Sequence, residues 1–295
     1  MQPSPDKGAS RSPSRPVTLR RTVTQLPGDT TRGIVVRVTD PCYNPRIRTI
    51  ARRVLPLLYI GSTVGCPCCD GTFRTFISRW SDDRLCPRCL SLRRHRALSL
   101  FLLEHLGAAD GRRTLLHFAP EEGLAAKLRA IPNVDYVSGD LDPRSPALVN
   151  FDITAIPFRD RSVDVVVCSH VLEHVTNDRL AMRELHRVLR PDGCMYTMHP
   201  VYRGIATTIE DPGVTDPDER RRLFGQIDHV RKYSLDDFIA RLGAAGFDVT
   251  VDNASANLSP DRREYYGVRD VERVFVCRPR SSGPRSSAIE VSKPE

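Results

Sequence analysis

Residues 115–124, LLHFAPEEGL, decide how the rest of this chain is interpreted. The run RTLLHFA at 113–119 is continuously apolar, as expected of a strand buried on both faces of a sheet. A helix-like segment follows it directly. In α/β proteins, a strand that turns at once into a helix is a common site for a nucleotide-like cofactor. Such turns are usually rich in glycine, but this one holds only Gly123.

The residues on either side alternate between strand-like and helix-like patterns. We expect strands at 113–119, 134–140, 148–153, 163–169, 194–199, 248–253 and 271–278, and helices at 93–106, 121–130, 177–190 and 234–245. The turn PDG at 191–193 is expected to end the third helix. Alternation of this kind predicts an α/β fold, with a doubly wound, mostly parallel, seven-stranded Rossmann-like sheet.

Length and composition allow one large domain, a small module and tails. The chain has 295 residues, 40% hydrophobic and 27% charged, with a net charge of +8. Much of that charge is arginine, which permits a nucleic-acid partner without favouring one. No run reaches the roughly 20 apolar residues of a membrane span, and residues 1–16 lack the apolar core of a secretory signal. Nine cysteines without such a signal indicate a reducing, cytoplasmic location.

We divide the chain by composition and pattern. Residues 44–59 place Ile47, Ile50, Ala51, Val54, Leu57 and Leu58 on one helical face, which fits a packing helix better than a helix on a membrane surface. The expected parts are a disordered basic tail at 1–30, an extension with this amphipathic helix at 31–62, a cysteine module at 63–92, the α/β domain at 93–280 and a disordered tail at 281–295.

The cysteine module contains two Cys-x-x-Cys pairs, Cys66/Cys69 and Cys86/Cys89, separated by sixteen residues. Each pair lets two thiolates of one tight turn bind the same ion, and two pairs complete a tetrahedral zinc site. An iron–sulfur site or free thiols are the alternatives. Cys68, inside the first pair, is a less well spaced fifth candidate. The segment TFRTFISRW at 72–80 fits the β-hairpin of a zinc ribbon, and four protein ligands would make the zinc structural.

Acidic residues stand at the ends of the second and third expected strands. Asp140 has the character of an acceptor for two ribose hydroxyls, and Asp152 for an adenine amine. Each is individually compatible with a turn or a helix cap. Their order and spacing after the first strand favour a cofactor site.

Two segments give the chain a recognisable resemblance: DITAIPFRDRSVDVVVCSHVLEHV at 152–175 and AMRELHRVLRPDGCMYTMHP at 181–200. With LGAAGFDVTV at 242–251, they make residues 113 to about 279 resemble class I S-adenosylmethionine-dependent methyltransferases, of the type 11 kind. The cysteine module followed by LHFAPE resembles a bacterial subgroup of that family. The resemblance implies S-adenosylmethionine as the cofactor.

The family's glycine motif is strongly altered in this chain. His117 stands where the family has an acid, Ala119 and Glu121 replace its first two glycines, and Gly123 is kept. S-adenosylmethionine carries no pyrophosphate, so the turn need not surround phosphate with bare amides, and Glu121 or Glu122 is expected to accept from the cofactor's ammonium. The resemblance implies a cofactor-binding set of His117, Ala119, Pro120, Glu121, Gly123, Asp140, Leu141, Asp152, Ile153 and Ser169.

Histidines are the candidates for proton transfer from the methyl acceptor. His170 and His174 are four residues apart, at a place where a short helix is expected, so they are predicted to share a face. GQIDHVRKY at 225–233 is expected to form a loop in which an Asp228–His229 pair makes His229 a base. We take His174 and His229 as the catalytic candidates. The alternatives are a packing histidine for His174 and a helix-capping loop for His229.

These observations predict a methyltransferase that acts on an oxygen or nitrogen of a small-molecule or sugar-like acceptor. The first alternative is an RNA methyltransferase that uses the zinc ribbon to bind its substrate. Against it, the fourth strand is followed by SHVLE rather than by the Asn/Asp-Pro-Pro-aromatic motif of many base methylases, and aromatic residues make up only 6% of the chain. The second alternative is a non-catalytic, zinc-bearing interaction protein on a methyltransferase fold.

Overall fold

The structure is a computed structural model that describes residues 45–78, 84–107, 111–200, 202 and 204–280. The tails predicted at 1–30 and 281–295 lie outside these residues, as does the start of the extension predicted at 31–62. All of the described residues belong to one compact unit of the chain. The boundaries that we place between its domains stay predictions.

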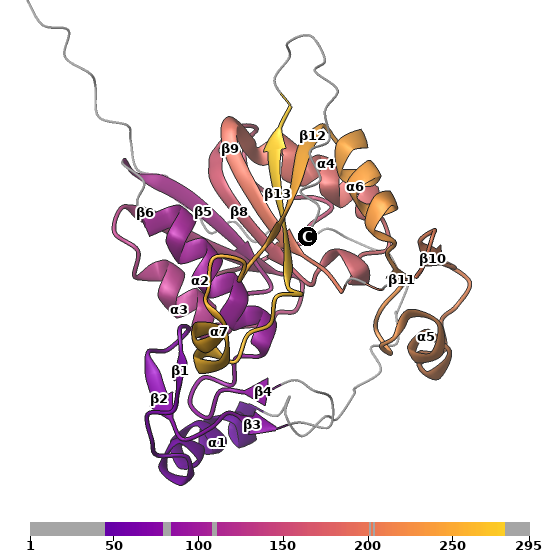
Figure 1. The fold of residues 1–295 in the computed structure, drawn as a ribbon. Helices are drawn as coiled ribbons and strands as arrows, with labels where there is room; N and C mark the ends of the chain where they lie inside the picture. The colour runs from indigo at the N-terminus through magenta and orange to yellow at the C-terminus, as the bar shows by residue number, and fades with distance from the viewer. Residues whose placement is uncertain (1–44, 79–83, 108–110, 201, 203, 281–295) are drawn as a thin grey trace, which may run out of the picture. The chain divides into compact units, whose positions relative to one another are not determined.

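A seven-stranded sheet organises the fold (Figure 1). Its order is β12–β13–β9–β8–β5–β6–β7, with bounds β5 Arg113–Phe118, β6 Val134–Asp140, β7 Val149–Asn150, β8 Val163–Ser169, β9 Leu189–Met198, β12 Phe247–Asn253 and β13 Arg273–Pro279. Strands β5 to β9 are parallel, and β13 runs antiparallel to both β9 and β12. The chain proceeds outward from β5 to β7 and then returns to place β8 on the other side of β5. The carboxyl ends of β5 and β8 therefore meet at a topological switch point.

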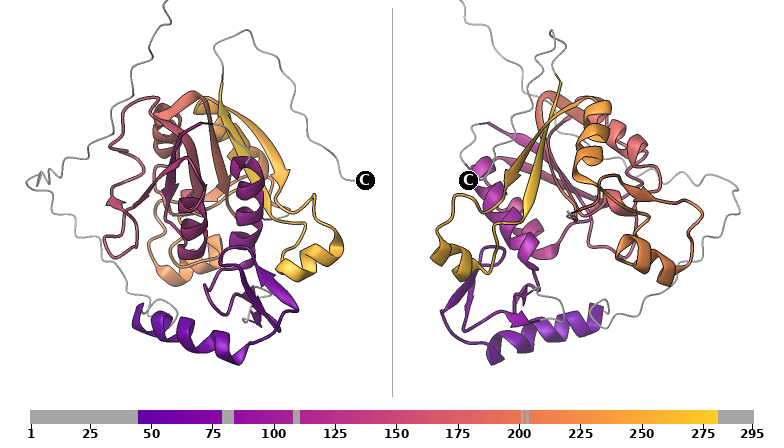
Figure 2. Two further views of the ribbon diagram at one scale, coloured as in Figure 1. Left: turned by 90° about the vertical axis from the view of Figure 1, so that its left-hand side faces the viewer. Right: turned by 45° about the vertical axis from the view of Figure 1, so that its right-hand side comes forward.

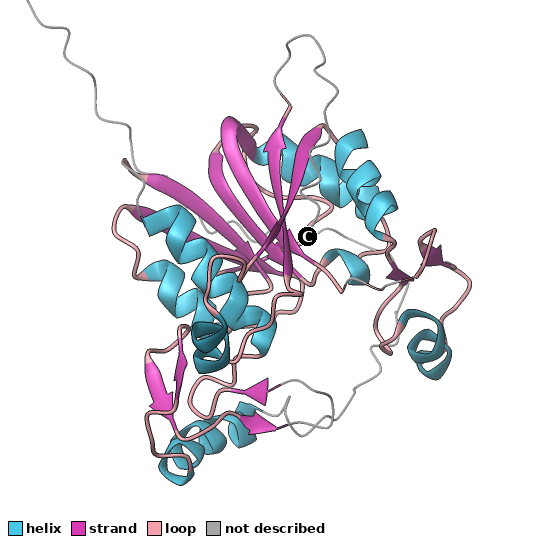
Figure 3. Ribbon diagram, in the orientation of Figure 1, coloured by secondary structure: helices cyan, strands magenta, loops and turns pink. Residues whose placement is uncertain are grey.

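Helices cover both faces of this sheet (Figure 3). Because successive side chains of a strand alternate between faces, Leu115 packs in the core with α2 (Arg93–Gly107) and α3 (Glu122–Arg129). Its neighbour Leu116 packs in the core with α4 (Asp178–Val188) and α6 (Leu235–Ala244). The two-faced burial explains the continuous apolar runs in the sequence. The predicted fold class, a doubly wound and mostly parallel seven-stranded sheet, is confirmed.

Three expectations about the sheet and its connections need correction. The strand expected at 148–153 is only the two-residue β7, and β9 begins five residues earlier than expected, so that the PDG turn lies within it. The pairing of β8 with β9 shifts register there, from Val163↔Leu189 to Val165↔Cys194, and the turn residues are accommodated as a bulge. Four short elements were not expected: β10 Ile209–Glu210, α5 Pro217–Phe224, β11 Arg231–Lys232 and α7 Pro260–Tyr266.

The cysteine module contains two separate two-stranded sheets. β1 (Val64–Cys66) pairs with β2 (Gly71–Phe73), and β3 (Ile77–Ser78) pairs with β4 (Arg84–Leu85). The single hairpin predicted within 72–80 is therefore wrong, because the first cysteine pair itself forms the turn between β1 and β2. Residues 79–83 lie outside the described part of the chain.

Helix α1 (Pro45–Leu58) runs beside the small strands of the module (Figure 2). Its expected apolar face does not pack within the described structure, since Ile50 and Leu57 are more than 60% exposed. The side chain of Ile47 is outside the description. No helix among the described residues is both long and apolar enough to cross a membrane.

Candidate active site

The turn after β5 contains a residue in a backbone conformation that favours glycine. Ala119, at the position of the family's first glycine, has a φ of 45° and lies in the left-handed region. Its amide donates to the Gly139 carbonyl at 2.9 Å, which ties the turn to the end of β6. A left-handed conformation costs a non-glycine residue about 1 kcal/mol. The turn therefore keeps a geometry that alanine adopts only at a cost.

Glu121 lies between two imidazoles instead of extending a free carboxylate from the turn. Its Oε2 is 3.2 Å from His117 Nε2, and its Oε1 is 3.5 Å from His95 Nε2. Burial raises the pKa of Glu121, but the two histidines outweigh burial and hold it at about 2. Burial also lowers the pKa of His95 to about 3. Glu121 is therefore a carboxylate beside a neutral His95 ring.

The other carboxylate of this turn, Glu122, forms an ion pair with Arg52 of α1. Gly123, predicted to bind the cofactor, lies in the first turn of α3 and contacts the cysteine module. A Cβ atom added there would come within 3.1 Å of the Cys68 Cβ and 3.2 Å of the Cys89 Cβ and Sγ. The close approach of these two cysteines therefore favours a glycine at position 123.

The ends of β6 and β7 carry the two predicted acidic residues. Asp140 Oδ1 accepts from the Asp142 amide at 3.0 Å, and Asp152 Oδ1 accepts from the Thr154 amide at 2.7 Å. Each aspartate therefore forms a turn, which was the alternative to a cofactor role for either residue alone. In each, the second carboxylate oxygen is not used by this hydrogen bond. Leu141 is 70% exposed beside Asp140, whereas Pro120 and Ile153 are buried.

The carboxyl ends of β8 and β9 hold buried polar atoms without a partner. No hydrogen bond within the described residues reaches Ser169 Oγ, Glu173 Oε2 or His199 Nε2. Burial lowers the pKa of His199 to about 4. Burial raises the pKa of Glu173, but His170, whose Nδ1 lies 3.2 Å from Glu173 Oε1, outweighs it, and the pKa is about 2. Unpaired buried polar atoms are rare in proteins, and three at one sheet edge indicate a place for a ligand.

The two candidate catalytic histidines are brought together. After β8, the 3₁₀ turn η2 (Leu172–His174) carries His174, and its ring centroid lies 4.7 Å from that of His229. The expected pairing of Asp228 with His229 is wrong: Asp228 Oδ2 is 3.5 Å from His174 Nδ1 instead. His229 is 1% exposed, and burial lowers its pKa. His170 precedes η2, so His170 and His174 flank Glu173 and do not share a helical face.

An arginine of the long insertion between β9 and α6 holds η2 in place. Arg231, in β11, donates to the carbonyls of Leu172, Val175 and Thr176. It also pairs with Glu210 of β10, which in turn pairs with Arg241 of α6. The hydrogen bond from Arg241 lowers the pKa of Glu210 to about 2. Glu210 of β10 is thus linked to β11 and to α6 by these two ion pairs.

The four predicted metal cysteines converge on one point. A ligand atom from each of Cys66, Cys69, Cys86 and Cys89 lies within 4.8 Å of all the others, and two Sγ–Sγ distances are 3.6 Å. Tetrahedral zinc with 2.3 Å bonds needs about 3.8 Å between sulfurs. Each pair ends in a left-handed residue, Asp70 with φ 53° and Leu90 with φ 59°. The cysteine cluster therefore has the shape of a four-thiolate site.

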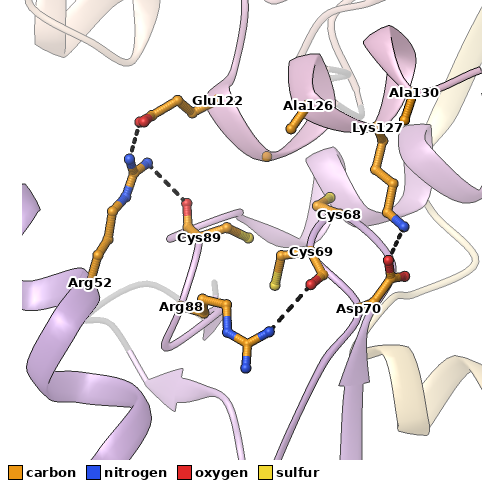
Figure 4. A pocket seen from close by; sticks show the side chains of 11 residues that line it. Arg52, Cys68, Cys69, Asp70, Arg88, Cys89, Glu122, Ala126, Lys127 and Ala130 are labelled. Atoms are coloured by element: carbon orange, nitrogen blue, oxygen red, sulfur yellow. Dashed lines mark hydrogen bonds and ion pairs between the residues drawn. The ribbon is translucent and has the colours of Figure 1, made fainter.

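An open hollow of about 460 Å³ lies between this cluster and α3 (Figure 4). Arg52 pairs with Glu122 and donates to the Cys89 carbonyl at 3.3 Å on one side of it. Lys127 pairs with Asp70 on the other side. These ion pairs join α3 to the module and to α1, so the hollow lies at their junction.

Sequence reasoning missed two residues of the edge. His199 directly follows the buried strand β9, and Glu173 forms part of the Leu-Glu-His segment used only for the resemblance. A polar residue directly after a buried strand is the signal that could have found His199. Nothing in one sequence could show that Glu173 is 2% exposed.

Part of this chain is similar to known methyltransferases. The methyltransferase domain family matches residues 107–197. An uncharacterized methyltransferase of Mycobacterium sp. (strain JLS) is 35% identical over 104 residues, which is 32% of this chain and 41% of that protein. A demethylmenaquinone methyltransferase of Chlorobaculum tepidum is 32% identical over 88 residues, 26% of this chain and 36% of that protein. The matched segments thus cover less than half of these relatives.

The solved structure of a Bacillus halodurans putative methyltransferase is also similar, with a TM-score of 0.42 and 18% identity over 62% of this chain and 99% of that one. The family match over residues 107–197 supports a methyltransferase domain in that part of the chain.

Proposed function

We propose that this chain is an S-adenosylmethionine-dependent methyltransferase that modifies an oxygen or nitrogen of a small-molecule or sugar-like acceptor. One observation carries the proposal: left-handed Ala119 at the end of β5 stands with Asp140 and Asp152 at the ends of the next two strands. Ala119 adopts a left-handed backbone that favours glycine, whereas Glu121, at the position of the second glycine, is extended. The Chlorobaculum relative, a demethylmenaquinone methyltransferase, supports a small-molecule acceptor.

The residues at this edge fit the cofactor chemically. Asp140 has a second oxygen for a ribose hydroxyl, and exposed Leu141 offers an apolar surface to an adenine ring. Asp152 would accept from the adenine amine, and the unpartnered Ser169 Oγ is a further polar contact. To His117, Pro120, Glu121, Gly123 and Ile153, the other residues predicted to bind the cofactor, this proposal gives the role of supporting the turn or the core. When bound, the cofactor supplies a methyl group made electrophilic by its sulfonium.

The chain's own contribution would be to align the acceptor and exclude water, which can lower a barrier by several kcal/mol. His174 and His229, at the end of β8, are the groups that we expect to receive or pass on the acceptor's proton. The cysteine cluster would bind zinc. With four thiolate ligands the ion has no open position, so its role would be structural.

The test is calorimetric titration of S-adenosylmethionine and S-adenosylhomocysteine into the wild type, Asp140→Ala and Asp135→Ala. Asp135 lies at the opposite end of β6, where it pairs with Arg112 on the surface, and is the matched control. We expect micromolar binding, weakened at least about tenfold by Asp140→Ala, the cost of one hydrogen bond to a charged group, and unchanged by Asp135→Ala. Absence of binding to folded wild type would overturn the proposal in favour of a non-catalytic protein.

A further inference from the structure

We propose that Glu173, His174 and His229 form a divalent-cation site that binds the hydroxyl group of the methyl acceptor. The three side chains offer one ligand atom each, and these atoms lie within 4.8 Å of one another. Two imidazoles and one carboxylate are a recurrent ligand set for divalent transition metals, with positions left open for substrate. The inference deepens the proposed function and rests on it for the methyl donor.

The hydrogen bonds of both histidines prepare them for an ion. His174 Nδ1 lies 3.3 Å from the Asp228 carbonyl oxygen, and His229 Nδ1 lies 3.2 Å from the Phe224 carbonyl oxygen. A carbonyl oxygen can only accept, so Nδ1 carries the proton in each ring. The lone pair of each neutral ring is therefore on Nε2. Metal-binding histidines are usually oriented by this kind of bond from the other ring nitrogen.

Glu173 supplies the negative charge, and its burial is otherwise unexplained. The residue is 2% exposed, and no hydrogen bond from the described part of the chain reaches its Oε2. Its other oxygen faces His170 at 3.2 Å. A carboxylate taken out of water needs compensation for each oxygen, and an ion at Oε2 would provide it.

Rigid neighbours fix the three ligands. The backbone amide of Val230 donates to the Glu173 carbonyl at 3.0 Å, which links His229's loop directly to η2. Arg231, 5% exposed, binds three carbonyls of the same turn. The long insertion between β9 and α6 thus brings a histidine distant in sequence to the end of β8, as a ligand set requires.

The open positions on the ion give the acceptor class. A bound cation lowers the pKa of a coordinated hydroxyl, as it does for water, and so makes its oxygen a better nucleophile. A neutral amine is already a nucleophile and gains nothing from this effect. We therefore assign an alcohol acceptor, such as a sugar hydroxyl. With the ion bound, His174 and His229 would hold the ion and would no longer take the proton themselves, so the hydroxyl proton would leave to water. The acceptor oxygen would bond to the methyl carbon, and the methyl–sulfur bond would break with its electron pair staying on sulfur, giving S-adenosylhomocysteine with a neutral sulfur.

The experiment is a titration of Mn²⁺ into the full-length protein with its cysteine site zinc-loaded, in the presence of S-adenosylhomocysteine. Free Mn²⁺ is read by electron paramagnetic resonance, and thiolates compete poorly for this ion. We expect one Mn²⁺ per chain. His174→Gln, a change at a side chain that is 34% exposed and safe for folding, should weaken binding at least about tenfold.

His105→Gln is the matched control, because His105 is also an exposed histidine whose Nδ1 meets a backbone carbonyl, that of Phe101 at 2.8 Å. It should leave binding unchanged. Absence of Mn²⁺ binding, or binding that His174→Gln does not weaken, overturns the cation site. Titration of S-adenosylmethionine into the same samples separates the two proposals: cofactor binding without Mn²⁺ retains only the methyltransferase, and Mn²⁺ binding without cofactor retains only the ion site.

Discussion

The cysteine cluster and the Glu173–His174–His229 cluster are the two groups of metal-ligating side chains that the described residues bring together. The first consists of four thiolates on two tight turns, which would fill all four coordination positions of a tetrahedral ion. The second has three ligands and leaves positions free for substrate. The module around the first also contacts α3 through Gly123 and through the Lys127–Asp70 ion pair, whereas the second lies at the switch point of the sheet. The difference separates an ion that would hold structure from one that would take part in chemistry.

The largest effect should come from removing two ligands of the cysteine cluster, the closed site in which all four ligands come from the protein. A structural zinc ion contributes on the order of 10 kcal/mol to the folding of small zinc domains. Cys66→Ser/Cys86→Ser should therefore lose about one equivalent of metal and the order of residues 64–91, measured by elemental analysis and limited proteolysis.

Cys68→Ser is the control for the closed site. Cys68 lies between two of the ligands but outside the four-cysteine group, with its Sγ 3.5 Å from the His95 carbonyl. This variant should keep its metal. Loss of metal from Cys68→Ser and not from the double variant would reverse our assignment of ligands.

A smaller effect should come from Gly123, where the closed site meets the α/β domain. In Gly123→Ala, the new methyl group would crowd Cys68 and Cys89, and overpacking typically costs about 1–3 kcal/mol. Helix propensity returns up to about 1 kcal/mol. We expect a net loss of about 1 kcal/mol in the free energy of unfolding, measured with urea, and unchanged affinity for S-adenosylmethionine.

Gly107→Ala serves as its control, since a Cβ at this helical position meets nothing within 4 Å. It should not destabilise the protein. A Gly123→Ala variant of normal stability that loses cofactor affinity would return Gly123 to the cofactor site, as the family motif implies.

The smallest effect should come from Ala119. Ala119→Gly removes the cost of a left-handed alanine, about 1 kcal/mol, but adds freedom to the unfolded chain. We expect a gain between about 0 and 1 kcal/mol by urea unfolding, with cofactor affinity kept. A loss of more than about 1 kcal/mol would mean that the methyl group of Ala119 matters more than its backbone.

Much of the sheet could be predicted because its strands are buried on both faces. Strands β6 and β8 have the predicted bounds, and in VDVVVCS, the run that forms β8, only Asp164 and Ser169 are polar. The elements of the insertion, β10, α5 and β11, could not be predicted in this way. Two-residue strands leave no periodic pattern, and they are stabilised by Arg231, Glu210 and Arg241, which come together only in the folded chain.

The sequence predicted individual residues of the candidate site but not which of them contact each other. Asp140, Asp152, His174 and His229 were predicted because they follow strands or stand in a polar loop, and their roles stay predictions. The partner of Asp228 was assigned to its sequence neighbour His229, but the fold gives it His174. Gly123 was assigned by motif to the cofactor, but its contacts are with cysteines more than thirty residues away.

Hydrogen–deuterium exchange with and without saturating S-adenosylhomocysteine tests the comparison most directly, because it observes both regions at once. Our account predicts slower exchange in peptides that cover the strand ends, at 117–125, 139–143, 151–155 and 168–175. Exchange in peptides from the cysteine module, residues 64–91, should not change. Protection centred on the cysteine module, or none at the strand ends of a protein saturated with ligand, would contradict it.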